Sequence, residues 1–228
     1  MKEGTMSNKL LLEAIIKYLS GLLIVSLLIF IPANTLNYPN AWLFISILFI
    51  PMFIVGLYLY FKNPLLLKSR LNAKEKEHDQ KEVLILSSIM FILGFIISGL
   101  NYHYKWIELP NIITIISTII FIISYILYGE VLRENTYLSR TIEVTNKQKV
   151  IDTGLYSIVR HPMYTITIIL FLSIPLILNS LPSFIIFLIY PFIIIKRINN
   201  EEKVLLKELK GYQEYQKKVK YKLIPFIY

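Results

Sequence analysis

Long uncharged apolar stretches alternate with short charged segments along this chain. Four windows contain no Asp, Glu, Lys or Arg: residues 18–61, 83–104, 109–129 and 161–195. A helix needs about 20 apolar residues to cross a hydrocarbon core about 30 Å thick. The pattern therefore predicts an all-α, polytopic membrane bundle of about six spans, near residues 14–34, 42–61, 83–103, 112–132, 162–178 and 182–197.

The last uncharged window differs from the others because Asn-Ser-Leu-Pro, at residues 179–182, interrupts it. Its first arm, residues 163–178, would form a helix about 24 Å long, which is short for a complete crossing. The second arm is expected to continue as a helix into Leu209, with Gly211 ending it. Between residues 205 and 219, apolar residues fall on one face of the expected helix and lysines fall on the opposite face. These features predict a C-terminal helical hairpin followed by an interfacial amphipathic helix.

Positive charge is distributed unevenly over the loops that these spans define. The net charge is +9, and every Lys or Arg except Lys105 falls on one side of the predicted bundle. The positive-inside rule then predicts a multi-pass protein of the cell membrane with both termini in the cytoplasm. Because the cations alternate with spans and do not form one patch, membrane lipids are the expected partners and nucleic acid is not.

Composition also excludes several kinds of chemistry. The chain contains no cysteine, which rules out disulfides and thiolate catalysis. His78, His103 and His161 are far apart and form no metal-ligand pattern, so no metal is predicted. The eight glycines form no phosphate-binding loop, and a soluble nucleotide-binding domain has no room. Helices and loops at the membrane edge would have to hold any adenosine cofactor.

The chain divides where the fourth predicted span ends. We expect residues 1–132 to form N-terminal transmembrane helices and residues 133–228 to form a cofactor-binding region with the helical hairpin. The loop at 133–159 is too long for a simple turn, and loops of this length are often functional. Its regular apolar content favours an ordered structure.

Charged residues stand at the start of the hairpin. Arg160 and His161 precede Pro162, whose fixed φ angle suits the first turn of a helix. Free N–H groups at such a start attract anions. The same residues also suit a membrane-edge cation and a structural proline, and the spacing alone leaves both interpretations open.

Acidic and basic residues follow the second arm of the hairpin. Arg197 and Glu201 are four residues apart on a predicted helix and can pair, and Glu202 is adjacent. An exposed pair of this kind is usually only a solvated helix face. At the end of an apolar arm, however, an arginine fork suits bidentate contact with a carboxylate.

Several pieces of residues 133–228 together resemble the isoprenylcysteine carboxyl methyltransferase family and its bacterial relatives. They occur in family-like order and spacing at residues 133–140, 148–156, 159–164, 197–202 and 211–215. Residues 63–66 and 75–77 resemble the bacterial branch less closely. One position departs from the pattern, since Ile166 stands two residues after the motif tyrosine, where relatives commonly have glycine.

This resemblance implies S-adenosylmethionine as the cofactor and a carboxyl O-methyltransferase activity at the cytoplasmic membrane edge. The implied acceptor is a lipid-like or prenylated small molecule or peptide. Arg197 and Glu201 are the predicted catalytic residues, with Arg197 holding the carboxylate and Glu201 orienting Arg197. The predicted cofactor-binding residues are Gln148, Tyr156, Arg160, His161, Pro162, Tyr164 and Glu202, with Asn135 and Tyr212 as further candidates.

A carboxylate is already a nucleophile at neutral pH, so its methylation needs desolvation and alignment and no general base. Three alternatives remain open. N-methylation of a phospholipid or another amine would give His161 or Glu201 the role of a base. An NADPH-dependent membrane reductase is the second, because sterol reductases resemble the same region. A transporter or scaffold is the third, although the spans contain almost no ionisable groups.

Overall fold

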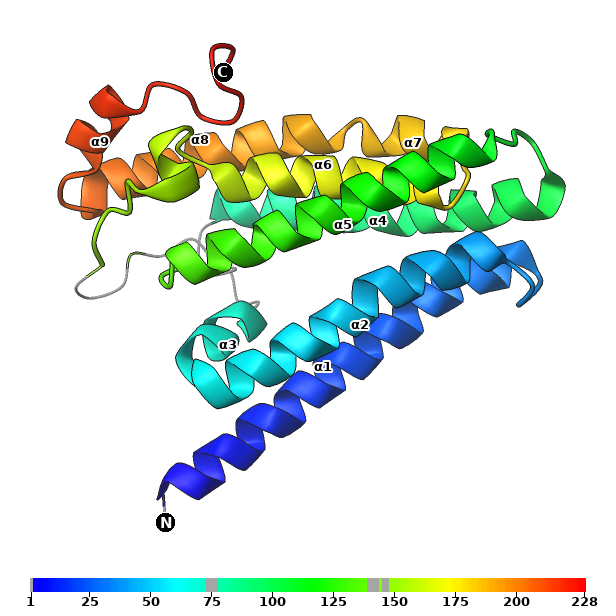
Figure 1. Ribbon diagram of the computed structural model, residues 1–228, viewed down its shortest axis with the longest axis horizontal. Coiled ribbons are helices and arrows are strands. Elements are labelled where there is room, and N and C mark those ends of the chain that lie inside the picture. Colours follow the sequence, from blue (N-terminus) through cyan, green and yellow to red (C-terminus); the bar gives the residue numbers. More distant parts are fainter. Residues whose placement is uncertain (1, 73–77, 139–143, 145–147) are drawn as a thin grey trace.

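A computed structural model describes residues 2–72, 78–138, 144 and 148–228, and it confirms an all-helical, polytopic bundle (Figure 1). Ser139, Arg140 and residues 75–77, which contributed to the family resemblance, lie outside the described residues. The elements in chain order are α1 (Lys2–Ala33), α2 (Pro39–Lys62), α3 (Pro64–Leu71), α4 (His78–Tyr104), α5 (Asn111–Glu134), η1 (Gly154–Ser157), α6 (Pro162–Ile177), α7 (Leu181–Phe187), α8 (Tyr190–Glu208) and α9 (Tyr212–Lys218).

The described chain has five segments long and apolar enough to cross a membrane: Asn8–Ala33, Pro39–Lys62, Lys81–Tyr104, Asn111–Glu134 and Leu181–Glu208. The last segment combines α7 and α8. The predicted first arm of the hairpin is α6, an apolar helix of only 16 residues. The six expected spans are therefore five full-length segments and one short helix.

The short helix α6 nevertheless reaches the end of the bundle that holds the α1–α2 and α4–α5 turns, which we call the far end. The Tyr38 hydroxyl, at the turn between α1 and α2, donates to the Leu178 carbonyl. The Asn101 side chain of α4 donates to the Asn179 carbonyl at 3.1 Å. A helix of 16 residues is about 24 Å long, which is less than the hydrocarbon thickness of about 30 Å. Because its far end is held among these loops, the start of α6 is set back from the level that a full-length span would reach.

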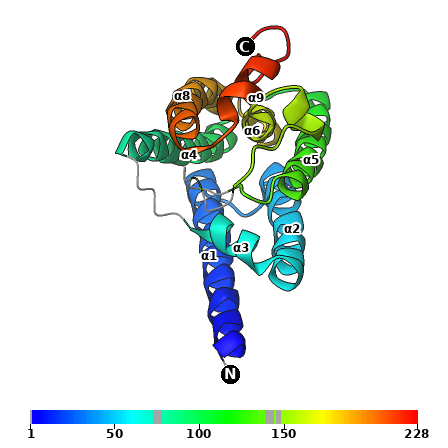
Figure 2. The ribbon, with the colours of Figure 1, turned by 90° about the vertical axis from the view of Figure 1, so that its left-hand side faces the viewer.

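Close helix contacts hold the bundle together at the far end. Gly99 of α4 lies against α1, where an added Cβ would be 2.4 Å from the Ile29 carbonyl oxygen. Small residues permit such approach between membrane helices. From this crossing, α1 and α2 diverge from the other helices toward the end where the chain begins (Figures 1 and 2). The helix α9 also lies at that end, so the start of α1 and the whole of α9 share one end of the bundle (Figure 1).

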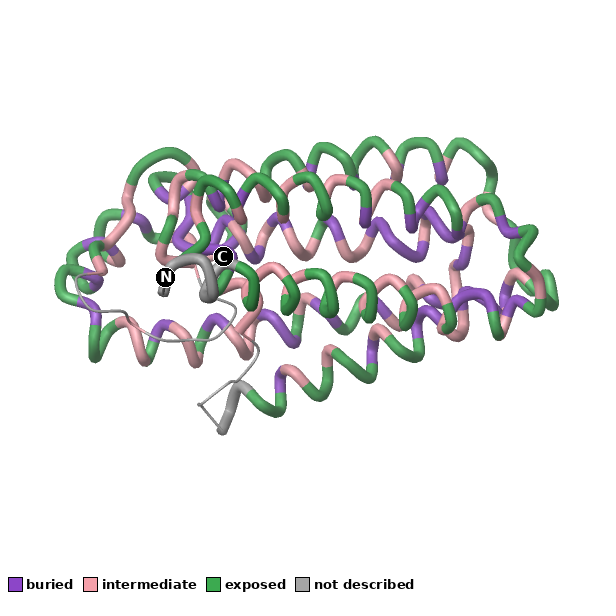
Figure 3. Tube along the Cα trace, turned by 90° about the horizontal axis from the view of Figure 1, so that it is seen from below, coloured by how far each residue is buried: buried purple, intermediate pink, exposed green. Residues whose placement is uncertain are grey.

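Burial follows the inward faces of these helices. Figure 3 shows buried positions facing neighbouring helices, while the outward faces are exposed. Many exposed residues are apolar, including Ile115, Ile119 and Ile126 of α5. A band of exposed apolar side chains on long helices is what contact with lipid requires. Between α2 and α4, the Asn63 side chain caps α3 by accepting the Leu66 N–H at 3.1 Å.

Candidate functional site

One pocket beside the start of α6 gathers most of the predicted site residues. Its empty volume is about 820 Å³, including its opening to solvent. The space inside it that can hold water is about 100 Å³, below the roughly 300–1,000 Å³ that small-molecule sites usually occupy. The walls come from α6, α8, α9, the turn η1 and the segments that follow α5. The predicted site residues that line the pocket are Asn135, Gln148, Tyr156, Arg160, His161, Tyr164, Arg197, Glu201 and Tyr212.

The turn before α6 depends on Gly154. Its φ angle is +51°, and an added Cβ would lie 2.0 Å from a carboxylate oxygen of Glu134 at the end of α5. The same carboxylate accepts a hydrogen bond from the Thr153 hydroxyl at 2.7 Å. Glycine therefore lets η1 pack against α5. This packing buries Tyr156, whose hydroxyl accepts a hydrogen bond from the Asn135 amide at 3.1 Å.

Residues 219–223, which we call the strap, cross the start of α6. The backbone N–H groups of Arg160 and His161 donate to the strap carbonyls of Tyr221 and Lys222, each at 2.9 Å. The Nη1 atom of Arg160 donates to two further strap carbonyls at 2.8 and 2.7 Å. The strap thus occupies the backbone N–H groups of the two residues that directly precede the helix.

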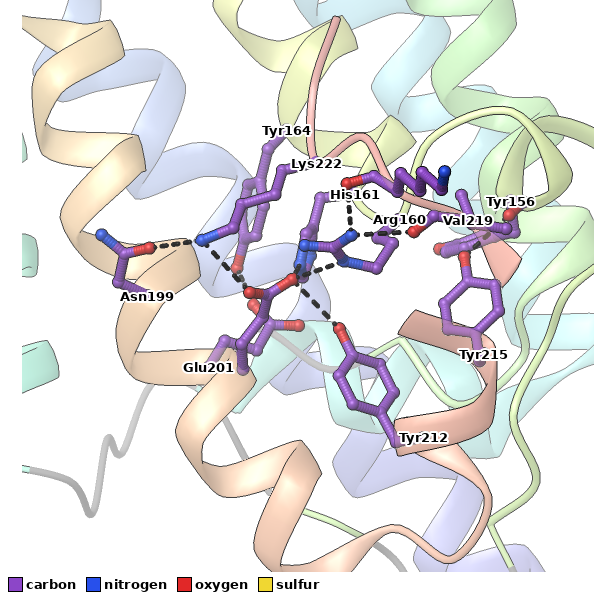
Figure 4. Close-up of polar contacts among 12 residues, drawn as sticks. Tyr156, Arg160, His161, Tyr164, Asn199, Glu201, Tyr212, Tyr215, Val219 and Lys222 are labelled. Atoms are coloured by element: carbon purple, nitrogen blue, oxygen red, sulfur yellow. Dashed lines mark hydrogen bonds and ion pairs between the residues drawn. The ribbon is translucent and has the colours of Figure 1, made fainter. Parts of the chain in front are cut away.

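Glu202 is the centre of a buried polar cluster behind the pocket. It is 5% exposed, and one carboxylate oxygen accepts from Arg160 Nε at 2.7 Å and lies 3.1 Å from His161 Nε2. The Tyr212 hydroxyl donates to the same oxygen at 3.4 Å, and Lys222 Nζ lies 3.2 Å from the other (Figure 4). Buried charges require such compensation. Glu202 therefore holds the Arg160 and His161 side chains in place through these contacts.

Two residues predicted to contact a cofactor do not line the pocket. Glu202 faces the cluster just described, and Pro162 is buried as the first residue of α6. The expected helix start at Pro162 is correct, because proline lacks the N–H group that a first helical turn leaves unpaired. The positions of these two residues favour indirect roles, through the side chains that they hold in place.

Tyr164 links two charged residues of α8 on the pocket side. Its hydroxyl donates to Glu201 Oε2 at 2.5 Å and accepts from Arg197 Nε at 2.8 Å. The guanidinium carbon of Arg197 also lies 5.9 Å from the centre of the Tyr164 ring. Sequence spacing predicted that Glu201 orients Arg197 directly, and the structure adds a tyrosine hydroxyl between them. A cation, a carboxylate and a hydroxyl thus line the same pocket.

Tyrosine rings form much of the remaining wall. Burial raises the pKa of Tyr156, Tyr212 and Tyr215 above the ordinary tyrosine value. Each therefore remains protonated at neutral pH, and the Tyr215 hydroxyl donates to the Tyr156 carbonyl at 2.7 Å. These side chains add aromatic faces and hydroxyl groups to the site without adding negative charge. The combination suits a ligand that carries both an aromatic ring and charges of opposite sign.

Sequence reasoning missed Lys222 and Tyr215 as contributors to this region. Lys222 was one of nine basic residues after the hairpin, and nothing in its neighbours distinguished it. Tyr215 had a usable signal, because it lies three residues after Tyr212 and such residues share a helix face. Both tyrosines are buried and line the pocket.

Comparison with known families gives one match. Residues 111–212 match the family model for phospholipid methyltransferases. This stretch begins with α5 and includes every pocket-lining residue except Tyr215. No curated protein matches the chain. The family match supports a membrane methyltransferase, and an isoprenylcysteine and a phospholipid are both consistent with it as acceptor.

Proposed function

We propose that this chain is an integral membrane methyltransferase that uses S-adenosylmethionine to methylate a carboxylate on a lipid-borne acceptor of the isoprenylcysteine type. The observation that carries this proposal is the joint placement of Arg197, Tyr164 and Glu201 in one pocket with Arg160 and His161. The match to phospholipid methyltransferases covers the same helices. Both findings support a methyl-transfer site built from α6 and α8.

The pocket residues fit the proposed cofactor in charge and in aromatic character. When bound, S-adenosylmethionine supplies an electrophilic methyl group on a positively charged sulfur. The Glu201 carboxylate and the rings of Tyr156 and Tyr164 suit its cationic groups. Arg160 and His161 suit its carboxylate, in keeping with the mixed lining of the pocket.

Within this proposal Arg197 orients the acceptor carboxylate. A guanidinium offers a planar pair of N–H donors that matches a carboxylate bidentately. Tyr164 restricts the guanidinium through the hydrogen bond to Nε, and Glu201 holds the Tyr164 hydroxyl in turn. No residue needs to remove a proton, since a carboxylate is already ionised at neutral pH. The contribution of the protein is alignment and exclusion of water.

The recessed start of α6 favours an acceptor that stays in the bilayer. Arg160 and His161 directly precede a helix too short to span the hydrocarbon core, and the far end of that helix is held among the opposite loops. We therefore expect the pocket to lie close to the level of the lipid headgroups. A lipid-tethered carboxylate would need to leave the membrane only slightly.

A second function is favoured by the family match and by Glu201. Phospholipid methyltransferases act on lipids, and an amine acceptor must lose a proton before it attacks a methyl group. Glu201 lines the pocket and accepts the Tyr164 hydroxyl, so its carboxylate is placed to receive such a proton. In this case Glu201 would be the base, and Arg197 would not be needed to hold the acceptor.

A labelled-methyl assay on purified protein tests both functions. The donor is radiolabelled S-adenosylmethionine, and the acceptors are prenylcysteine analogues or phosphatidylethanolamine in nanodiscs. A methyl ester is released by base and an N-methyl product is not. We expect base-labile product from the prenylcysteine analogue. Failure of the wild-type protein to bind S-adenosylhomocysteine in calorimetry would refute the methyltransferase proposal as a whole.

Substitution of Arg197 tests the carboxylate mechanism. We expect Arg197→Ala to lower turnover by about 100-fold, in line with the loss of one aligned charged donor, while binding of S-adenosylhomocysteine persists. Lys203→Ala is the matched control, because Lys203 is an exposed cation on the same helix outside the pocket. Wild-type turnover by a correctly folded Arg197→Ala protein would exclude this role for Arg197.

A further inference from the structure

Beyond the strap the chain forms a compact turn of residues 224–228, which we call the tail turn. The N–H groups of Leu223 and Ile224 donate to the Tyr228 carbonyl at 2.8 and 2.9 Å, and the Tyr228 N–H donates back to the Ile224 carbonyl at 3.1 Å. These hydrogen bonds give the turn a defined shape. It is therefore a structured element of the protein.

The tip of the tail turn presents apolar side chains to the surroundings. Phe226 is 86% exposed and Ile227 is 77% exposed, and Ile224 beside them is 48% exposed. Single exposed apolar residues are common on proteins, but a contiguous apolar tip usually marks a contact surface. Within the described structure no helix packs over this tip, so its partner is not part of the chain fold shown in Figure 1.

The level of the tail turn along the bundle follows from the hydrogen bonds of the strap. Tyr221 and Lys222 pair with Arg160 and His161, directly before α6. The next strap residue, Leu223, accepts the Thr165 hydroxyl at 2.7 Å, in the first turn of that apolar helix. The chain thus climbs along α6 as it approaches the tail turn.

Leu223 is also part of the main hydrophobic core of the bundle. The tail turn therefore begins beside the apolar part of α6, and Figures 1 and 2 show it projecting sideways from α6 and α8. Residues that project sideways from a membrane bundle at this level meet the bilayer. Protein or water is the expected neighbour only beyond the helix ends.

Exposed cations flank the strap. Lys217 and Lys220 are exposed at the end of α9 and at the start of the strap. Lys222 donates to the Asn199 side chain at 2.7 Å, at a level of α8 where polar residues have replaced apolar ones. An exposed apolar tip next to exposed lysines is the combination that a membrane interface accommodates.

We propose that the tail turn is a membrane-contact element that binds the anionic surface of the leaflet nearest the pocket. Phe226 and Ile227 enter the acyl-chain region, and Lys217 and Lys220 contact anionic lipid headgroups. The inference rests on the strap, the exposure of the tip and the charges, and it is independent of the proposed methyl transfer. Because strap carbonyls bind Arg160, this contact also ties the pocket wall to the membrane surface.

The absence of cysteine from the chain allows a direct test by spin labelling. Single variants Phe226→Cys and Ile227→Cys are labelled in vesicles of phosphatidylcholine with phosphatidylglycerol. Accessibility to oxygen is then compared with accessibility to a water-soluble nickel complex. Gln213→Cys is the matched control, since Gln213 is exposed on α9. We expect the labels at 226 and 227 to favour oxygen and the label at 213 to favour nickel.

Labels at 226 and 227 that are as accessible to nickel as the label at 213 would overturn the proposal. Lipid charge provides a second arm. We expect the labels at 226 and 227 to move deeper when phosphatidylglycerol is added to phosphatidylcholine, and the double variant Lys217→Gln with Lys220→Gln to lose that shift. Equal depth of the labels at 226 and 227 in both lipid compositions would refute the proposed binding to anionic headgroups.

Discussion

At the scale of residues, two adjacent glutamates have different surroundings because they follow one another on a helix. Successive residues of an α-helix point about 100° apart. Glu201 therefore lines the pocket and accepts the Tyr164 hydroxyl, while Glu202 faces the buried cluster with Arg160. Of the two acids at the end of the hairpin, one is available to a ligand and the other compensates buried cations.

This division predicts that Glu202 matters more for stability than an exposed acid on the same helix. We expect Glu202→Gln to lower the free energy of unfolding by about 3 kcal/mol, because it leaves Arg160 and Lys222 without their buried counter-charge. Thermal or denaturant unfolding in detergent measures the change. Glu208→Gln, at an exposed position of α8, is the control with almost no expected effect. Equal stabilities of the two variants would contradict the interpretation.

At the scale of elements, the pocket depends on three short segments that long helices hold in place. The turn η1 presents Tyr156, α9 presents Tyr212 and Tyr215, and the strap holds Arg160. None of these segments is long enough to be stable alone, since isolated short helices are marginal in water. Their order comes from packing against α5, α6 and α8.

Gly154 provides the test at this scale. We expect Gly154→Ala to destabilise the protein by more than about 1 kcal/mol, because alanine disfavours the φ angle of +51° and its Cβ would collide with Glu134. Binding of S-adenosylhomocysteine should weaken as well, since η1 carries Tyr156. Gly129→Ala is the matched control, because an added Cβ there meets no atom within 4 Å. A Gly154→Ala protein with unchanged stability and binding would exclude this role for the turn.

At the scale of the whole molecule, the start of α1 and all of α9, which lines the pocket, lie at one end of the bundle (Figure 1). The turn between α4 and α5, which contains Lys105, lies at the other end (Figure 1). The positive-inside rule leads us to propose that the pocket end faces the cytoplasm. A cytoplasmic orientation would give the site access to a water-soluble cofactor made inside the cell.

Accessibility of single cysteines tests the orientation. We expect an impermeant thiol reagent added to intact cells to label Asn37→Cys, in the turn between α1 and α2, and not Gln213→Cys on α9. Permeabilised cells should show labelling at both positions, which controls for reactivity. Both side chains replaced are exposed. Labelling of Gln213→Cys in intact cells would reverse the proposed orientation.

Local sequence signals predicted the helices well where the physics is local. The start of α6 at Pro162, the continuation of α8 to Glu208 and the helix break at Gly211 agree with the structure. The sequence could not show which of the candidate site residues share a pocket, because a residue name does not reveal which way its side chain points. Pro162 and Glu202 were grouped with the other candidates, yet neither lines the pocket.

The amino-acid sequence by itself determined the membrane-spanning helices, because the bilayer thickness converts apolar length directly into helix length. It also determined which charged and aromatic residues were available at the end of the hairpin. Only the tertiary structure decided that Tyr164 joins Arg197 to Glu201 and that the strap bonds Arg160. These contacts join residues 33 or more positions apart in the chain. Such pairs depend on how whole helices pack, and no local pattern encodes that packing.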